Sequence, residues 1–217
     1  MHIPDGFLTA NTWIPAWLIS IAGIGYCLKK TALVLKDRMV PLMGVMSAFI
    51  FAAQMLNFPV IGGTSGHLLG GVLSAVLLGP YGGAIVLSVV LIAQCLIFQD
   101  GGLTTLGANI FNMSFVGAIG GYFVYTIIRR ITPFSVFDRR QGGNKGLIIA
   151  TSLAAWLSVV MSSCACAIEL AMSDTLPLKV ALPAMAGVHA LIGIGEAIIT
   201  SMVIGFVLRV RPDLIYK

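Results

Sequence analysis

Residues 68–98 read LLGGVLSAVLLGPYGGAIVLSVVLIAQCLIF and contain no Asp, Glu, Lys or Arg. An uncharged apolar run of about 18 residues or more is long enough to cross a bilayer as a helix. The run is interrupted at Gly79-Pro80-Tyr81-Gly82-Gly83, and glycine and proline are the residues that most often end helices. We therefore expect two membrane helices, over residues 68–79 and 80–98. The first is short for a hydrocarbon core of about 30 Å.

The rest of the chain has the same apolar character. Its 217 residues are 58% hydrophobic and only 10% charged, whereas soluble domains carry about 25% charged residues. No basic segment precedes the first apolar stretch, so we do not expect a cleaved signal peptide. The composition predicts an all-α integral membrane protein, in which residues 1–217 form one domain with a bundle of seven transmembrane helices. The other five helices are expected at approximately residues 13–28, 39–57, 107–128, 147–172 and 181–208.

The basic residues predict the orientation of this bundle. Lys and Arg collect in the cytoplasmic loops of membrane proteins. With seven helices, an outside N-terminus and a cytoplasmic C-terminus, every basic residue except Lys179 lies on the cytoplasmic side. The net charge of +5 is then explained by a lipid bilayer, and nucleic acid is not an expected partner. The cytoplasmic set is Lys29, Lys30, Lys36, Arg38, Arg129, Arg130, Arg139, Arg140, Lys145, Arg209, Arg211 and Lys217.

The first two residues can chelate a metal ion. The free amine of Met1, the amide nitrogen of His2 and Nδ1 of His2 close two fused chelate rings and place three nitrogens in one plane. A planar nitrogen set of this kind favours Ni(II) or Cu(II) and leaves a fourth position open. Residues 1–12 are therefore predicted to be an N-terminal metal-binding segment.

The predicted topology brings His67 to the same outer face as this segment. Residues 58–67 and 99–106 are both expected to be outer loops, with His67 at the outer end of the third helix. His67 is the candidate for the fourth ligand, and a surface or helix-capping role is the alternative. A ligating histidine usually gives its other ring nitrogen to an oxygen acceptor. Candidates for such partners are Asp5, Asn57, Gln94, Gln99 and Asn109, whose amides could instead join helices to one another.

Two further groups could carry chemistry. His189 and Glu196 share one face of the last predicted helix and could form a proton relay, a second cation site or an interhelical hydrogen bond. The four cysteines match no zinc or heme motif and are expected to be small buried residues, although Cys164 and Cys166 could form a redox pair. The sequence has no Gly-x-x-x-x-Gly-Lys-Ser/Thr motif and no motif of a hydrolytic nucleophile, so we do not expect an enzyme.

Three blocks of sequence resemble one known family. They are MHIPDGFL at residues 1–8, SGHLLGG at 65–71 and FQDGGLTTLGAN at 98–109. Together they resemble the CbiM/NikM family, the substrate-binding membrane components of energy-coupling-factor transporters for cobalt and nickel. The resemblance covers essentially the whole chain. It implies that Met1, His2 and His67 bind the ion, that the N-terminal segment is tucked inward, and that the protein is a multi-pass component of a prokaryotic cell membrane.

The resemblance also implies partners and a function. A transmembrane scaffold and two cytoplasmic ATPases would supply the energy, and a small accessory membrane subunit is expected as a separate polypeptide. We expect capture and uptake of Ni(II) in preference to Co(II), with no cofactor besides the substrate metal. One alternative is a stand-alone proton-coupled carrier that uses His189 and Glu196. The other is a membrane electron carrier with heme between His67 and His189.

Overall fold

The computed structural model describes residues 1–35, 37, 39–60, 64–131 and 145–216. Of the basic residues used to predict the orientation, Lys36, Arg38, Arg139, Arg140 and Lys217 lie outside the described residues. Helices make up most of the described chain, which confirms the predicted helical character. They are α1 (Ala10–Ala32), α2 (Met39–Gln54), α3 (Gly71–Phe98), α4 (Leu106–Ile110), the π-helix η1 (Phe111–Gly120), α5 (Gly121–Ile131), α7 (Lys145–Met172), α8 (Leu178–Val210) and the 3-10 helix η3 (Pro212–Leu214).

The break expected at residues 79–83 is a sharp reversal inside α3. Gly79 has φ 80° and ψ 163°, a conformation that glycine adopts at little cost. The next residue, Pro80, has no N–H with which to continue the helix. The two halves of α3 then lie close together. A Cβ added to Gly83 would be only 2.8 Å from the Cα of Ala75. The first half begins at Gly71 and not at the expected residue 68.

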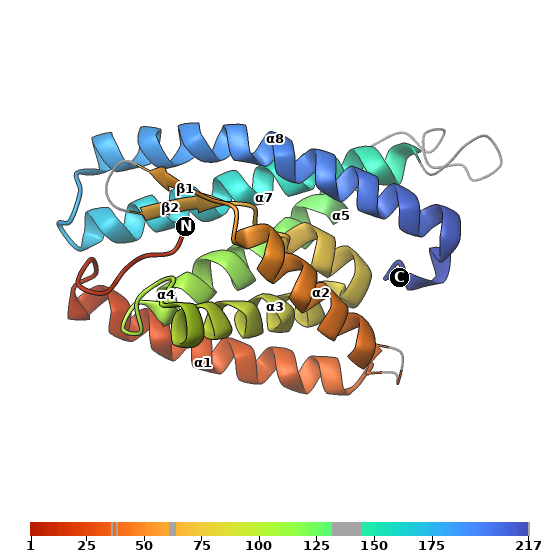
Figure 1. The fold of residues 1–217 in the computed structure, drawn as a ribbon, viewed down its shortest axis with the longest axis horizontal. Coiled ribbons are helices and arrows are strands. Elements are labelled where there is room, and N and C mark those ends of the chain that lie inside the picture. Colours follow the sequence, from red (N-terminus) through yellow and green to blue (C-terminus); the bar gives the residue numbers. More distant parts are fainter. Residues whose placement is uncertain (36, 38, 61–63, 132–144, 217) are drawn as a thin grey trace.

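The prediction that the chain is purely α-helical is wrong for residues 57–60 and 64–67. Helix α2 ends at Gln54, before the expected residue 57, and two short strands follow it (Figure 1). Strand β1 (Asn57–Val60) pairs antiparallel with β2 (Thr64–His67), with Asn57 opposite His67. Two runs with a β-branched residue in each, separated by a few residues that include glycine, are a hairpin signal. The runs are too short to show a clear strand periodicity, so the sequence alone predicts a loop at residues 58–67.

The α4, η1 and α5 segments form one continuous rod, which crosses the bundle beside α3 and α7 (Figure 1). The N-terminal segment, residues 99–105 and residues 173–177 meet at one end of the bundle, which we call the N-terminal end. The opposite end carries the Gly79 reversal and the C-terminal residues, where the backbone N–H of Tyr216 donates a hydrogen bond to the Val76 carbonyl.

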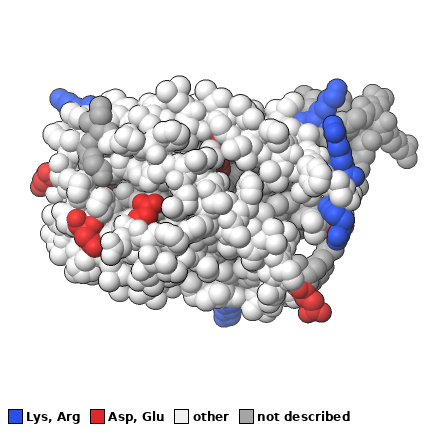
Figure 2. All heavy atoms as spheres, viewed as in Figure 1, with Lys and Arg blue, Asp and Glu red and all other residues white. Residues whose placement is uncertain are grey.

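The outer surface of the bundle is that of a membrane protein. Several large apolar side chains on the outside of the helices are between 61% and 71% exposed, namely Leu18, Leu96, Phe123, Leu191 and Met202. Figure 2 shows a broad uncharged surface, with most Lys and Arg side chains toward one end and most Asp and Glu side chains toward the other. Among the described residues, α3, the rod Leu106–Ile131, α7 and α8 are long and apolar enough to cross a membrane, and α2 is a shorter apolar helix. An apolar surface of this extent requires lipid around it.

Candidate metal site

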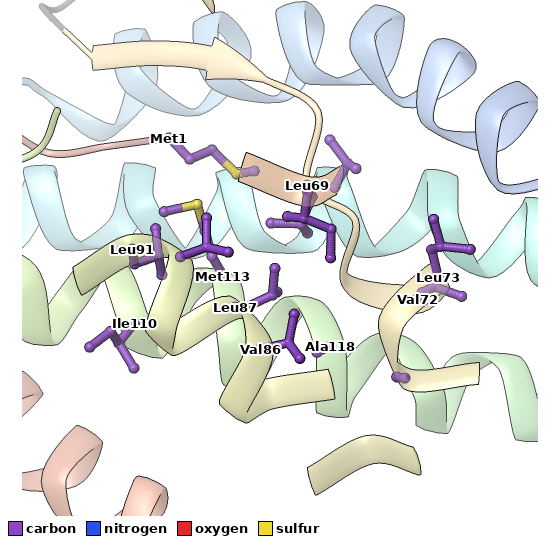
Figure 3. Close-up of a cluster of buried hydrophobic side chains, with 14 of the residues drawn as sticks. Met1, Leu69, Val72, Leu73, Val86, Leu87, Leu91, Ile110, Met113 and Ala118 are labelled. Carbon is purple, nitrogen blue, oxygen red and sulfur yellow. The ribbon is translucent and has the colours of Figure 1, made fainter. Parts of the chain in front are cut away.

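The N-terminal segment lies inside the protein. Met1 and Ile3 are both 0% exposed, and the Met1 side chain packs among Leu69, Leu91 and Met113 in the core (Figure 3). A buried chain terminus needs partners for its backbone groups. The Ile3 N–H donates to Asn109 Oδ1 at 2.9 Å, and the Ile3 carbonyl accepts from the Gly102 N–H at 2.9 Å.

Asp5 ties the same segment to the loop before α4. Its carboxylate accepts hydrogen bonds from the backbone N–H groups of Leu103 and Thr104, at 3.0 and 2.8 Å. The hydrogen bond from the Thr104 hydroxyl is the largest cause of a lowered Asp5 pKa. Gly102 has no room for a side chain, because an added Cβ would overlap the Asp5 backbone and carboxylate. Residues 1–5 and 100–105 therefore form one hydrogen-bonded unit.

The Met1 amine and the His2 amide converge on Ser65 in strand β2. The amine donates to the Ser65 carbonyl, and it lies 3.2 Å from Ser65 Oγ. The His2 amide also lies 3.2 Å from Ser65 Oγ, and His2 Nδ1 lies 3.5 Å from it. One hydroxyl thus contacts all the nitrogens of the predicted N-terminal chelate. Burial lowers the pKa of the Met1 amine to about 5, so the amine is neutral at pH 7 and has a free lone pair.

The His2 ring is held by two side chains. Its Nε2 lies 3.1 Å from Gln94 Oε1, and its Nδ1 lies 3.3 Å from Asp100 Oδ1. Burial lowers the pKa of His2 to about 3, which makes the imidazole neutral. When Nε2–H donates to Gln94, the lone pair of Nδ1 faces the Asp100 carboxyl group. A cation placed beside Nδ1 would satisfy both the lone pair and the carboxylate.

His67 presents a free nitrogen to the same place. It is 0% exposed, and its Nδ1 lies 2.7 Å from the Leu68 carbonyl oxygen, to which it donates. Its Nε2 is buried without a hydrogen-bond partner among the described residues. Burial lowers the pKa of His67, with further lowering from the nearby amine and His2. The expectation that His67 lies at the outer end of a helix is wrong: it ends β2, inside the protein.

The two imidazoles have the spacing of neighbouring ligands. Their rings are stacked with centroids 4.5 Å apart and 29° between planes. With metal–nitrogen distances of about 2 Å, two imidazoles on adjacent corners of a square have centroids about 4.5 Å apart. No group of three or more His, Cys, Asp or Glu side chains among the described residues is arranged to hold a metal ion. A site here would therefore depend on main-chain nitrogen.

A cleft of about 600 Å³ gives access to this place from the N-terminal end. It is lined by residues of the N-terminal segment, β2 and the loop after α3, among them His2, Asp5, Ser65, Gln99 and Asp100. Asp5 and Asp100 make this cleft acidic, and such a lining concentrates cations.

Of the predicted partners of the histidines, three make contacts at the site and two do not. Gln94 contacts His2, while Asn109 and Asp5 bind the N-terminal backbone and the loop beside it. Asn57 is exposed at the start of β1, and Gln99 is exposed at the rim of the cleft. Sequence reasoning missed Ser65 entirely, and it placed Asp100 with Asp5 in an acidic outer vestibule without predicting its contact with His2. The signal for Ser65 was its place two residues before His67, where a strand puts both side chains on one face.

The other predicted groups are bonded mainly to backbone. His189 Nδ1 lies 2.8 Å from the Met185 carbonyl, and both Glu196 oxygens accept from the backbone N–H groups of Leu69 and Gly70. No hydrogen bond joins His189 to Glu196 among the described residues, so they do not form a direct proton relay. Cys164 and Cys166 are both free thiols.

Comparison with known proteins places the chain in a family. Residues 2–214 match the CbiM family, described as the cobalt uptake substrate-specific transmembrane region. A putative fused nickel transport protein of Archaeoglobus fulgidus is 41% identical over 99% of this chain and 68% of its own length. A fused nickel transport protein of Rhodobacter capsulatus is 31% identical over 99% of this chain and 64% of its own length.

A solved structure agrees with this placement. The crystal structure of a truncated transition metal transporter superposes with a TM-score of 0.85 at 32% identity, and the match covers 96% of this chain and 99% of that one. The family match spans nearly the whole sequence, and the expected resemblance to CbiM and NikM proteins is confirmed. The chain therefore belongs to the CbiM family of substrate-specific membrane proteins for metal uptake.

Proposed function

We propose that this protein captures a divalent transition metal ion at the outer face of a prokaryotic cell membrane, and that it prefers Ni(II) to Co(II). The observation that carries this proposal is the buried amine of Met1, whose pKa burial lowers to about 5, beside His2 and His67. An ordinary chain terminus is charged and exposed, and burying it requires a reason. Metal binding supplies that reason, because a neutral amine is a strong nitrogen ligand.

The proposed site has four nitrogen ligands in one plane. They are the Met1 amine, the deprotonated His2 amide, His2 Nδ1 and His67 Nε2. The ion enters through the acidic cleft beside Asp100 and replaces the Ser65 hydroxyl as the common neighbour of the N-terminal nitrogens. The Gln94 contact to Nε2 of His2 then fixes the ring in the tautomer that leaves Nδ1 free.

The planar nitrogen set is the basis for preferring nickel. Square-planar nitrogen coordination suits Ni(II) and Cu(II), whereas Co(II) is less commonly found in it. The names of the relatives include both nickel and cobalt transport proteins.

Uptake would need seven membrane crossings and partner proteins. The crossings are α1, α2, the two halves of α3, the α4–η1–α5 rod, α7 and α8, with the N-terminus outside and the C-terminus in the cytoplasm. Lys29, Arg129 and Arg209 lie in the last turns of α1, α5 and α8, and these helix ends lie away from the N-terminus (Figure 1), which supports this orientation. We propose that a transmembrane scaffold, two cytoplasmic ATPases and a small accessory membrane subunit complete an energy-coupling-factor transporter.

A change at the first residue tests the site. One alanine added before Met1, or acetylation of Met1, removes the primary amine from the chelate, and Ni(II) binding in isothermal titration calorimetry should be lost. The matched control is one alanine added after Lys217. Thermal unfolding of both variants checks that the bundle is still folded, because an added residue must find room beside the buried Met1. Normal Ni(II) affinity with the extended N-terminus would contradict the proposed ligand set.

A further inference from the structure

The segment that carries His67 is held from two sides. Gln54, at the end of α2, donates from Nε2 to the Leu69 carbonyl at 2.9 Å. From α8, Glu196 Oε2 accepts from the Leu69 N–H at 2.9 Å and Oε1 accepts from the Gly70 N–H at 2.6 Å. Residues 68–70 lie between these two side chains without regular secondary structure.

One of these contacts leads directly to His67. The Leu69 N–H that Glu196 accepts and the Leu68 carbonyl that accepts from His67 Nδ1 belong to the same peptide group. A hydrogen bond to the N–H of a peptide increases the negative charge on its carbonyl oxygen, because hydrogen bonds in a chain polarise one another. The Glu196 carboxylate is therefore coupled to the His67 ring through one peptide unit.

The cost of burying Glu196 supports a functional reading. Glu196 is 3% exposed, and the small cavity beside it is lined mainly by apolar side chains such as Phe49, Leu73 and Ile199. Acidic residues within membrane helices are expensive and mark functional places. Both oxygens of this carboxyl group accept from backbone N–H groups, which is the arrangement that favours a carboxylate. On the other side of the same segment, the neutral side chain of Gln54 donates a hydrogen bond to the Leu69 carbonyl.

We propose that Glu196 is a positioning residue for His67: through the Leu68–Leu69 peptide group it fixes the tautomer with hydrogen on Nδ1 and makes Nε2 a stronger electron donor. A ligating histidine whose other nitrogen donates to a carboxylate is a recurrent arrangement in metal proteins. Here a peptide group stands between the carboxylate and the histidine. The effect on metal binding rests on the proposed function, whereas the effect on the His67 ring does not.

The first experiment needs no metal. The full chain with 15N-labelled histidine is compared by NMR with Glu196→Gln, in which an amide NH₂ replaces one acceptor and opposes a backbone N–H. The His67 signal, assigned with His67→Ala, should show a weaker Nδ1–H hydrogen bond and less of the Nδ1–H tautomer. Gln54→Met is the matched control, since it removes a bond to the neighbouring peptide and leaves the Leu68–Leu69 peptide untouched.

The second experiment titrates the same variants with NiCl₂. Partners of metal-bound histidines are worth about 10- to 100-fold in affinity, and Glu196→Gln should lose an amount in this range. The absorption band of bound Ni(II) should also shift, because the donor strength of one ligand has changed. Gln54→Met should leave both the band and the His67 signal in place. Should Glu196→Gln not fold, Glu196→Asp keeps the charge at a greater distance and should give smaller shifts in the same direction.

The outcomes separate the two proposals. An unchanged His67 signal in Glu196→Gln, or an equal change in Gln54→Met, would overturn the proposed effect of Glu196 on the His67 ring. Glu196 would then only anchor the segment. A changed His67 signal with unchanged Ni(II) affinity would support the effect of Glu196 on the His67 ring. It would also count against His67 as a ligand, which is a failure of the proposed function.

Discussion

His67 in the Thr64–Gly70 segment and His189 in helix α8 share their burial and their hydrogen bonding, but they differ in the ring that packs against them. Both are 0% exposed, both have Nδ1 within 2.8 Å of a backbone carbonyl, and both have Nε2 buried without a hydrogen-bond partner among the described residues. His67, however, stacks on His2 at 4.5 Å, and its segment also holds the Met1 amine through Ser65. His189 bonds back to Met185, one turn earlier in a regular helix.

The difference shows what makes a buried imidazole a candidate ligand here. In helix α8 the backbone nitrogens are already used in hydrogen bonds to carbonyls four residues earlier, so His189 has no free main-chain nitrogen in its own segment. The Met1 amine and the His2 amide belong to no helix or strand, and within the described part of the chain their hydrogen bonds are to Ser65. The chain terminus therefore adds donors that no histidine within a helix can collect.

Removing each imidazole in turn should give the largest contrast between the two regions. His67→Ala deletes a proposed ligand and should weaken Ni(II) binding by more than about 100-fold, because partners of the ligands alone are worth up to about 100-fold. His189→Ala should change the affinity little. Calorimetric titration of both variants, with thermal unfolding to check that each is folded, measures this. Equal losses in the two variants would mean that His189 also belongs to the site.

Gln94 sharpens the contrast, since His2 depends on a side chain where His67 depends on a backbone carbonyl. Gln94→Ala removes the partner of His2 Nε2 and should lower Ni(II) affinity by about 10- to 100-fold. Ser74→Ala is the control on the same helix, because the Ser74 hydroxyl donates to the Gly71 carbonyl in its own first turn. An affinity in Gln94→Ala equal to that of the unchanged protein would show that packing alone orients His2.

The pH dependence of Ni(II) affinity should reveal main-chain ligands at the proposed site, which a site built on His189 would lack. The lowered pKa values of Met1, about 5, and His2, about 3, mean that both groups are already neutral above pH 6. Only the His2 amide proton must then leave, so one proton per ion should be released and affinity should rise about tenfold per pH unit between pH 6 and 9. Below pH 5 the amine also takes up a proton, and the slope should steepen.

Calorimetry in buffers with different ionisation enthalpies counts the released protons. A flat profile between pH 6 and 9, with no proton released, would remove the amide nitrogen from the ligand set. The site would then resemble an ordinary histidine site such as His189 could provide.

Of the four predictions, the replacement of Asp100 should have the smallest effect on Ni(II) binding. It is 24% exposed beside His2, where burial raises its pKa, and it lines the cleft through which an ion would enter. Asp100→Asn should slow Ni(II) association a few-fold and weaken its dependence on salt, because charge steering is lost. Asp174→Asn, an exposed acid at the same end, should change neither in stopped-flow measurements. An unaltered rate in Asp100→Asn would argue that the ion enters elsewhere.

Local sequence was sufficient for features that depend on local chemistry. The uncharged run at residues 68–98 predicted membrane helices, and the Gly79–Pro80 pair predicted their interruption, because hydrophobicity and backbone freedom belong to the residues themselves. The roles of Asn57 and Gln99 could not be judged in this way. Both are amides near helix ends like Gln94, and only their positions in the fold make them exposed where Gln94 is buried.

The sequence by itself determined that this is a helical membrane protein of the CbiM family, and it selected Met1, His2 and His67 as the nitrogens to test. The tertiary structure alone decided that Ser65 and Asp100 border the same nitrogens, and that Glu196 reaches the peptide beside His67. The physical reason is separation along the chain. Burial and hydrogen bonds between residues as distant as Leu69 and Glu196 arise from the packing of whole helices, which no local pattern encodes.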